Sequence, residues 1–174
     1  QMCIRDSRHR ASVLGYQLRF YDPWIEQCSQ GLAQRVTLES LLEQADVISL
    51  HLPLTAQSLH LLNDARFAQV KPGAMLINTA RGGIVDSEAL LRALQSGAVS
   101  MALLDVVQEE PSAPKALIEH ERVLMTPHAA FYSERSLAEL KRNALQTMLT
   151  LLQGDKVKTL VNPDCIAKEA KGYA

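Results

Sequence analysis

The stretch INTARGGIVDSEALLRAL, from Ile77 to Leu94, decides the fold. Its apolar opening reaches an arginine, Arg81, which two glycines and a helical pattern of apolar residues follow. A buried strand followed by a helix is the repeating unit of an α/β protein with a parallel sheet. An arginine at the end of such a strand is poorly placed for packing but well placed to meet an anion. The stretch therefore predicts an α/β fold with an anion site at one edge of its sheet.

The same alternation of short apolar runs and helical patterns extends over most of the chain. Thr37 and Asp86 are expected helix N-caps, and Gly97 is expected to end the helix that Asp86 begins. Strands bounded by helices, with apolar residues on both faces, indicate a parallel sheet covered by helices on each side. The expected strands are residues 18–22, 46–53, 74–80, 100–106 and 122–128, and the expected helices are residues 37–45, 63–70, 87–97 and 133–154.

Composition narrows the class of protein. The chain has 174 residues, of which 47% are hydrophobic and 21% charged, and its formal net charge is −1. That balance gives no basic surface for nucleic acid, and the apolar runs are too short to span a membrane. Cys3, Cys28 and Cys165 are far apart and form no CxxC pair, which favours a reduced, cytoplasmic protein without a metal site.

Polar or ionisable residues stand where the expected strands end. In open parallel sheets, ligands bind beyond the carboxyl ends of the strands, so these residues should face one edge. An arginine, two acids and two histidines at a single edge indicate a ligand site rather than ordinary loop polarity. The residues are Asp22, His51 to Thr55, Thr79 to Gly82, Asp105 and His128.

Asp22 points to the kind of ligand. A carboxylate at the end of an early strand can accept both hydroxyls of an adenine ribose and repels a 2′-phosphate, which favours NAD over NADP. The alternative is a turn aspartate that precedes Pro23. A GxGxxG loop is expected about 20 residues upstream of such an acid. Its glycines would fall at or before the start of the chain, so we expect the sheet to lack its first strand and glycine-rich loop.

Four quoted motifs carry a specific resemblance: HLPLTAQSLHLLND (51–64), INTARGGIVDSEAL (77–90), LLDVVQEEP (103–111) and TPHAAFYSE (126–134). In this order and spacing, the chain from Ala11 to Pro163 resembles the cofactor-binding domain of the D-isomer-specific 2-hydroxyacid dehydrogenases. The resemblance implies a Rossmann-like, doubly wound parallel sheet. HAAFYSE is most similar to the branch of the C-terminal-binding proteins, dehydrogenase-like corepressors, although that branch carries tryptophan where Phe131 stands here.

The resemblance implies three catalytic residues, Arg81, Glu110 and His128. Arginine offers a rigid fork of donors to the carboxylate and carbonyl of a 2-oxo acid, and histidine can exchange a proton with the substrate oxygen. A glutamate bonded to the imidazole would fix its tautomer. Judged separately, Arg81 could be a surface residue in a glycine-rich turn and His128 a loop histidine. Glu109 could equally be the histidine's partner.

The resemblance also implies NAD as cofactor, a small 2-oxo or 2-hydroxy acid as substrate, and a homodimer. Thr126 is a weaker candidate for lining the pocket, and His60 matches no role, so we expect it on the surface. The implied cofactor-binding residues are Asp22, His51, Leu52, Pro53, Thr55, Thr79, Ala80, Arg81, Asp105, His128 and Ala130.

The expected organisation has four parts. Residues 1–7 are interpreted as a non-native segment and excluded from the fold. Residues 8–132 form a partial dinucleotide-binding domain, 133–163 a helix and return segment toward a missing substrate domain, and 164–174 a loose tail. We expect an NAD-dependent oxidoreductase whose fragment is weakly active or inactive alone. The alternatives are an NAD(H)-sensing binding protein of the corepressor type and an inert truncated reading frame.

Overall fold

The computed structural model describes residues 2–26, 31–110 and 112–157. It divides into two units, residues 1–130 and 131–174, and each is described by itself. The elements in chain order are α1 (Met2–Val13), β1 (Arg19–Phe20), β2 (Gln34–Arg35), α2 (Leu38–Gln44), β3 (Val47–Leu50), α3 (Asp64–Phe67), β4 (Ala74–Asn78), η2 (Gly82–Ile84), α4 (Ser87–Ser96), β5 (Val99–Leu104), α5 (Lys115–Ile118), β6 (Val123–Met125) and α6 (Glu134–Leu152).

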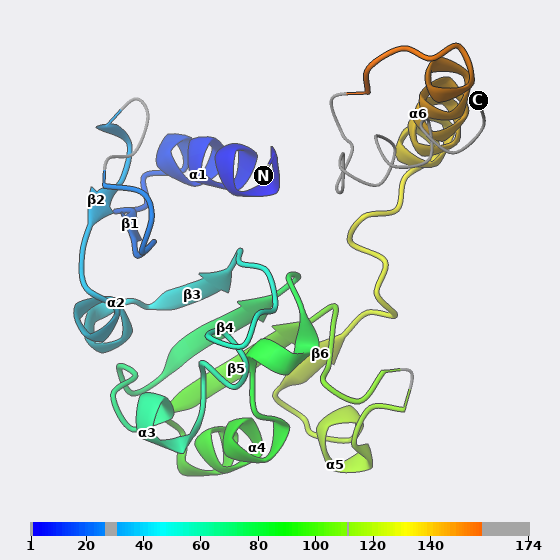
Figure 1. The fold of residues 1–174 in the computed structure, drawn as a ribbon. Helices are drawn as coiled ribbons and strands as arrows, with labels where there is room; N and C mark the ends of the chain where they lie inside the picture. Colours follow the sequence, from blue (N-terminus) through cyan, green and yellow to red (C-terminus); the bar gives the residue numbers. More distant parts are fainter. Residues whose placement is uncertain (1, 27–30, 111, 158–174) are drawn as a thin grey trace. The chain divides into compact units, whose positions relative to one another are not determined.

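All paired strands of the first unit run parallel, as the sequence predicts. Four of them form one sheet in the order β3-β4-β5-β6, while β1 and β2 pair in a separate sheet (Figure 1). Within the described residues, β3 pairs only with β4, so one of its edges is open.

The core lies on one face of the four-stranded sheet. Helices α3 and α4 cover that face (Figure 1), and Leu76, Leu90 and Leu94 there are at most 1% exposed. The opposite face differs from the expectation that the strands are buried on both sides. Met101 on β5 is 39% exposed and Leu124 on β6 is 59% exposed. Side chains of these strands that point to the covered face are therefore buried, and side chains that point to the other face are more exposed.

The helix ends follow the predicted caps. The N–H of Ser40 donates to Thr37 Oγ1 over 3.2 Å, and the N–H groups of Glu88 and Ala89 each donate to Asp86 Oδ1 over 3.0 Å. Gly97 ends α4 with φ of 79°, a left-handed conformation that suits glycine. These caps fix where α2 and α4 begin and where α4 ends.

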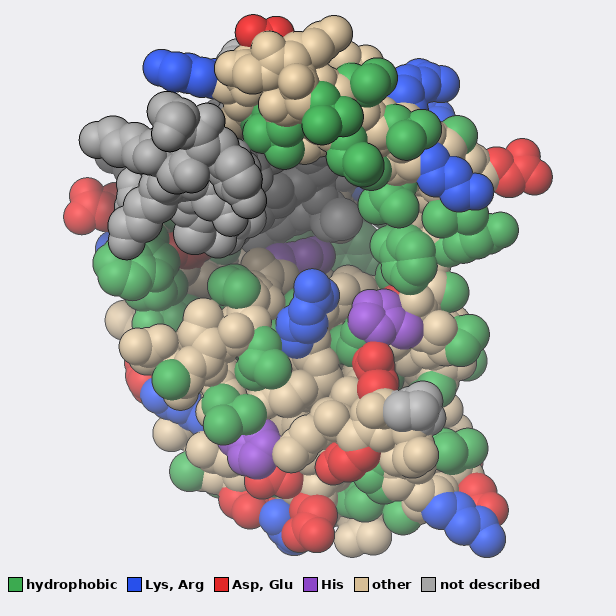
Figure 2. Space-filling model, turned by 45° about the vertical axis from the view of Figure 1, so that its right-hand side comes forward, with side chains coloured by type: hydrophobic (Ala, Val, Ile, Leu, Met, Phe, Trp, Pro, Cys, Tyr) green, Lys and Arg blue, Asp and Glu red, His purple; other side chains and the backbone are tan. Residues whose placement is uncertain are grey.

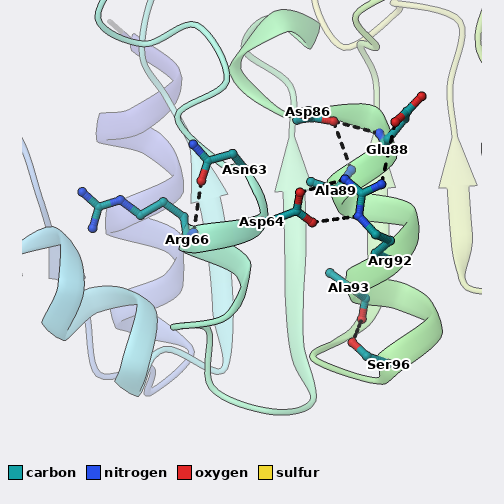
Figure 3. A network of polar contacts seen from close by, with 9 residues as sticks. All are labelled: Asn63, Asp64, Arg66, Asp86, Glu88, Ala89, Arg92, Ala93 and Ser96. Atoms are coloured by element: carbon teal, nitrogen blue, oxygen red, sulfur yellow. Dashed lines mark hydrogen bonds and ion pairs between the residues drawn. The ribbon is translucent and has the colours of Figure 1, made fainter.

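A further polar network ties α3 to α4. Asn63 caps α3 by accepting from the N–H of Arg66 over 3.2 Å, and Arg92 on α4 donates two hydrogen bonds of 2.8 Å to Asp64 on α3 (Figure 3). This fork-to-fork geometry joins the two helices at the protein surface.

Three short elements and the extent of α1 were not predicted. β2 and α5 are too short to show a periodic pattern, and η2 is a single turn inside a glycine-rich segment. α1 begins at Met2, so part of the segment excluded as non-native is helical. The long helix expected at 133–154 is confirmed as α6. None of the helices described could cross a membrane.

Candidate functional site

The register of the four-stranded sheet places the predicted polar residues in one row. Leu50, Asn78, Leu104 and Met125 are paired across β3, β4, β5 and β6. The next residue on each strand is therefore at the carboxyl edge. Those residues are His51, Thr79, Asp105 and Thr126. The sequence rule that strand ends meet at one edge holds for this sheet.

The turn that carries Arg81 is shaped by Asn78, which is 1% exposed. Its side-chain oxygen accepts from the N–H of Ala80 over 3.0 Å, and its amide nitrogen donates to the carbonyl of Arg81 over 3.1 Å. The guanidinium of Arg81 is exposed and donates to the carbonyl of Ala80 over 2.6 Å. Sequence analysis missed Asn78, although an amide at the end of an apolar strand is a signal that could have identified it.

Gly82 lets the arginine loop touch the loop that follows β5. A Cβ atom at Gly82 would lie 1.9 Å from the carbonyl carbon of Val107, which no side chain can occupy. Glycine is thus required because another backbone approaches here. Arg81 is consequently held next to the segment that leads to Glu110.

The structure distinguishes the two candidate glutamates. His128 Nδ1 lies 2.8 Å from Glu110 Oε2, whereas Glu109 accepts from the buried hydroxyl of Ser87 over 3.1 Å. The bond from His128 is the largest cause that lowers the pKa of Glu110, burial opposes it, and the N–H of Val107 contributes further by donating to Oε1 over 3.1 Å. Because a carboxylate only accepts, Nδ1 of His128 carries the proton in this bond.

The loop of His128 is held by Asp105, which is 6% exposed. One carboxylate oxygen accepts from Thr126 Oγ1 over 2.5 Å and from the N–H of Ala129 over 2.8 Å, and the other accepts from the N–H of Ala130 over 2.9 Å. Burial raises the pKa of Asp105, but these three donors outweigh it and the net pKa is lowered. His128 adopts φ of 52°, so the bonds hold a backbone conformation that is uncommon without glycine.

Asp105 therefore has protein partners where the sequence predicted a contact with the nicotinamide carboxamide. Two donors already occupy one of its oxygens and a third uses the other. The role that these contacts support directly is to orient the loop of His128. A contact with the cofactor stays a prediction.

The loop after β3 is folded upon itself. The hydroxyl of Ser58, which is 7% exposed, donates to the carbonyl of Pro53 and accepts from the N–H of Thr55, both over 2.7 Å. His51 Nε2 lies 2.9 Å from Ser49 Oγ, and burial lowers the pKa of its imidazole. The lowered pKa favours the neutral form of this imidazole.

Asp22 lies after β1, in the separate two-stranded sheet. Its Oδ1 accepts from the N–H of Trp24 over 2.8 Å and of Ile25 over 3.2 Å, which is an Asx turn. Asp22 therefore has the geometry of a turn aspartate, the alternative named in the sequence analysis. Both of these bonds use Oδ1, and neither uses Oδ2. The Asx turn is observed, and the ribose contact stays a prediction.

The structure thus brings together His51, Thr79, Asp105 and His128 at the main sheet edge, and it joins Arg81 to Glu110 through Gly82. Basic, acidic and histidine side chains are exposed in the view of Figure 2. The side chains of Glu110 and His128 are 38% and 46% exposed, so a ligand can reach them. Within the part of the chain that the structure describes, no group of three or more metal-binding side chains occurs.

Comparison with known proteins gives a consistent family. The model described as "D-isomer specific 2-hydroxyacid dehydrogenase, NAD binding domain" matches residues 5–130. A D-lactate dehydrogenase of Treponema pallidum (strain Nichols) is 38% identical over 156 residues, which cover 82% of this chain and 47% of that protein.

Solved structures agree with this comparison. The holo form of Rhodotorula graminis D-mandelate dehydrogenase gives a TM-score of 0.81 at 34% identity, covering 87% of this chain and 46% of that one. The D-lactate dehydrogenase of Lactobacillus jensenii, solved with NAD+, gives 0.80 at 29% identity, covering 86% and 49%. The chain spans about half the length of the relatives it matches.

Proposed function

The chain belongs to the D-isomer specific 2-hydroxyacid dehydrogenase family, and we propose that it is the NAD-binding half of an enzyme that interconverts a D-2-hydroxy acid and a 2-oxo acid. The observation that carries the proposal is the hydrogen bond of 2.8 Å between Glu110 and His128. Glu110 belongs to the loop after β5. The backbone of that loop at Val107 packs against Gly82, the residue after Arg81. His128 as the base, Glu110 as the acid that orients it and Arg81 as the cation then lie on neighbouring loops.

The residues present fit a dinucleotide in part. The row from His51 to Thr126 at the carboxyl edge of the sheet supplies hydroxyl, imidazole and backbone groups. Asp22 would hold the adenine ribose, Leu52, Pro53 and Thr55 the adenosine side, and Thr79, Ala80 and Ala130 the nicotinamide side. When bound, NAD supplies or accepts the hydride.

The chain's own side chains would manage charge and protons. His128 would give a proton from Nε2 to the substrate's carbonyl oxygen during reduction and take it back during oxidation. Glu110 would fix the tautomer of that imidazole. Arg81 would bind the substrate carboxylate and stabilise the negative charge that develops on the oxygen.

The relatives indicate the substrate class. Their names specify D-lactate and D-mandelate dehydrogenases, whose substrates share a carboxylate beside a secondary alcohol. We propose a substrate of this class, a homodimer, and residence in a reducing, cytoplasmic environment suggested by the scattered cysteines. The division at 132/133 and the return of residues 133–163 toward a second domain are proposals too. No observation specifically favours a corepressor-type role.

The first experiment measures dinucleotide binding by this chain. Trp24 is 90% exposed and lies two residues after Asp22, so its fluorescence should transfer energy to bound NADH. We expect saturable transfer in the wild type and weaker binding by Asp22→Ala, with Asp155→Ala as an exposed control. A chain that is folded by circular dichroism yet shows no transfer would contradict NAD binding.

The second experiment measures turnover on the full-length gene product, because the chain spans about half the length of its relatives. We expect NADH oxidation with pyruvate, glyoxylate or phenylglyoxylate. Arg81→Ala should lower kcat/KM by about 10²–10³-fold. Arg92→Ala, which removes an arginine from the surface of α4, should leave it unchanged. Full activity in Arg81→Ala would overturn the role given to Arg81.

A further inference from the structure

His60 joins the two loops that carry the proposed catalytic residues. Its backbone N–H donates to the carbonyl of Gly83 over 2.8 Å, in the loop that carries Arg81. Its Nε2 lies 3.0 Å from Oε1 of Gln108, in the loop that leads to Glu110. His60 therefore contacts both of the loops that meet where Gly82 packs against Val107.

The path from Gln108 to the catalytic pair is short. Val107, its neighbour, donates its N–H to Glu110 Oε1 over 3.1 Å, and Glu110 Oε2 accepts from His128 over 2.8 Å. Movement of the backbone at 107–108 would change both bonds of the glutamate. The side chain of Gln108 has no role in the proposed chemistry itself.

The backbone of His60 has an unusual conformation. It adopts φ of 49°, and only His60 and His128 among the described residues other than glycine have positive φ. Such conformations persist where the surroundings impose them and are concentrated at functional sites. From this backbone conformation, the half-buried ring of His60 reaches the side chain of Gln108.

We propose that His60 and Gln108 are positioning residues, which clamp the loop after β5 so that Glu110 meets His128 in the orientation that catalysis needs. The significance for catalysis rests on the proposed function, but the clamp itself can be tested without turnover. Because Oε1 of Gln108 can only accept, His60 Nε2 is the donor. A side chain that keeps a donor at this distance should preserve the clamp.

The test follows the titration of the Glu110 carboxyl by ¹³C NMR in this chain. In the wild type the pKa of Glu110 is lowered, chiefly by the hydrogen bond from His128 and in part by the Val107 N–H. Gln108→Ala removes the acceptor of the clamp, so the pKa of Glu110 should rise toward its ordinary value. Gln44→Ala is the matched control, because it removes an exposed amide that bonds Ser40 on α2. It should leave the titration unchanged.

Two variants of His60 separate the clamp from backbone strain. Asparagine tolerates the left-handed conformation well but is too short to reach Gln108. Glutamine suits the backbone less well but places an amide nitrogen near the position of Nε2. The proposal predicts that the pKa of Glu110 rises in His60→Asn and stays low in His60→Gln. The carboxylates of Asp105 and Glu109 are retained in every variant, so their charges do not differ.

The outcomes are decisive. An unchanged Glu110 titration in Gln108→Ala would overturn the clamp, as would a rise in His60→Gln equal to that in His60→Asn. Gln108→Ala alters no strained backbone, so it remains informative if a His60 variant fails to fold. A clamp that passes this test in a full-length product without 2-oxo acid reduction would contradict the proposed function and leave the clamp standing.

Discussion

Helices α4 and α6 are built alike and packed differently. Each has an apolar stripe and a capped start, with Asp86 before α4 and Ser133 before α6. α4 buries five residues, whereas none of the nineteen residues of α6 is buried. Periodicity thus predicts that a helix forms and which side is apolar. It does not say what the apolar side contacts.

The same difference governs how the proposed catalytic residues are held. Arg81 precedes η2 and α4, whose packing fixes the residues after it. His128 precedes α6, which buries nothing that could anchor it. Its position depends instead on Asp105, which bonds Ala129 and Ala130 from the end of β5. One half of the site is supported by a core and the other by a buried carboxylate.

The largest expected effect separates the two helices directly. Leu94→Ala in α4 removes a side chain that is 0% exposed, which should lower the free energy of unfolding by about 2–5 kcal/mol. Leu145→Ala in α6, at a side chain 62% exposed, should change it by less than about 0.5 kcal/mol. Urea denaturation followed by Trp24 fluorescence and circular dichroism measures both. Equal losses would mean that α6 is packed in solution.

Much of the fold could be predicted because its elements are locally determined. Thr37, Asp86 and Gly97 were identified as caps from residue type and position alone, and each is confirmed. β2 was missed because Gln34 and Arg35 carry no apolar signal. The exposed second face of the sheet was missed because apolar residues such as Leu124 do not show whether a neighbour covers them.

The second prediction concerns the support of His128. Asp105→Asn replaces an acceptor with an amide N–H group that cannot accept from Ala130, so the free energy of unfolding at pH 7 should fall by about 1–3 kcal/mol. The folded pKa of Asp105 is lowered, so its stabilisation is present above the unfolded pKa of about 3.9 and is lost as pH falls through the folded value. The gap between wild type and variant should therefore narrow below pH 4 or so.

Denaturation at several pH values measures that gap, and Asp155→Asn, at an exposed aspartate, serves as the control. A gap that stays constant down to pH 3 or so would show that Asp105 does not act through its charge.

The candidate site was predictable in its residue types but not in its bonds. The strand ends supplied Arg81 and His128, and the resemblance added Glu110. On the sequence pattern alone Glu109 and Glu110 were equivalent until the bond to Ser87 distinguished them. His60 was expected on the surface because it matched no role in the resemblance. Its partner, Gln108, is 48 positions away in the sequence. A contact of that kind depends on how loops meet in space, and no local pattern encodes it.

The third prediction compares the caps. Asp86→Ala leaves the N–H groups of Glu88 and Ala89 without their acceptor and should cost about 1 kcal/mol, since α4 belongs to the cooperative core. Ser133→Ala removes a capping box from α6 and should lower helix content without lowering the unfolding free energy of the first unit. Far-ultraviolet circular dichroism combined with urea denaturation separates the two. If both variants lower that free energy equally, the helices unfold together.

The smallest effect is expected from surface ion pairs. Arg92 bonds Asp64 on another helix through two contacts of 2.8 Å, whereas Arg135 bonds Glu139 one turn away in α6 over 2.7 Å. Both pairs are exposed to screening by salt, so each contributes less than the Asp86 cap. Arg92→Ala should still destabilise the first unit more than Arg135→Ala does, because only Arg92 joins two elements of that unit. The difference should shrink at high salt, and a difference unaffected by salt would mean that the aliphatic part of Arg92 packs rather than pairs.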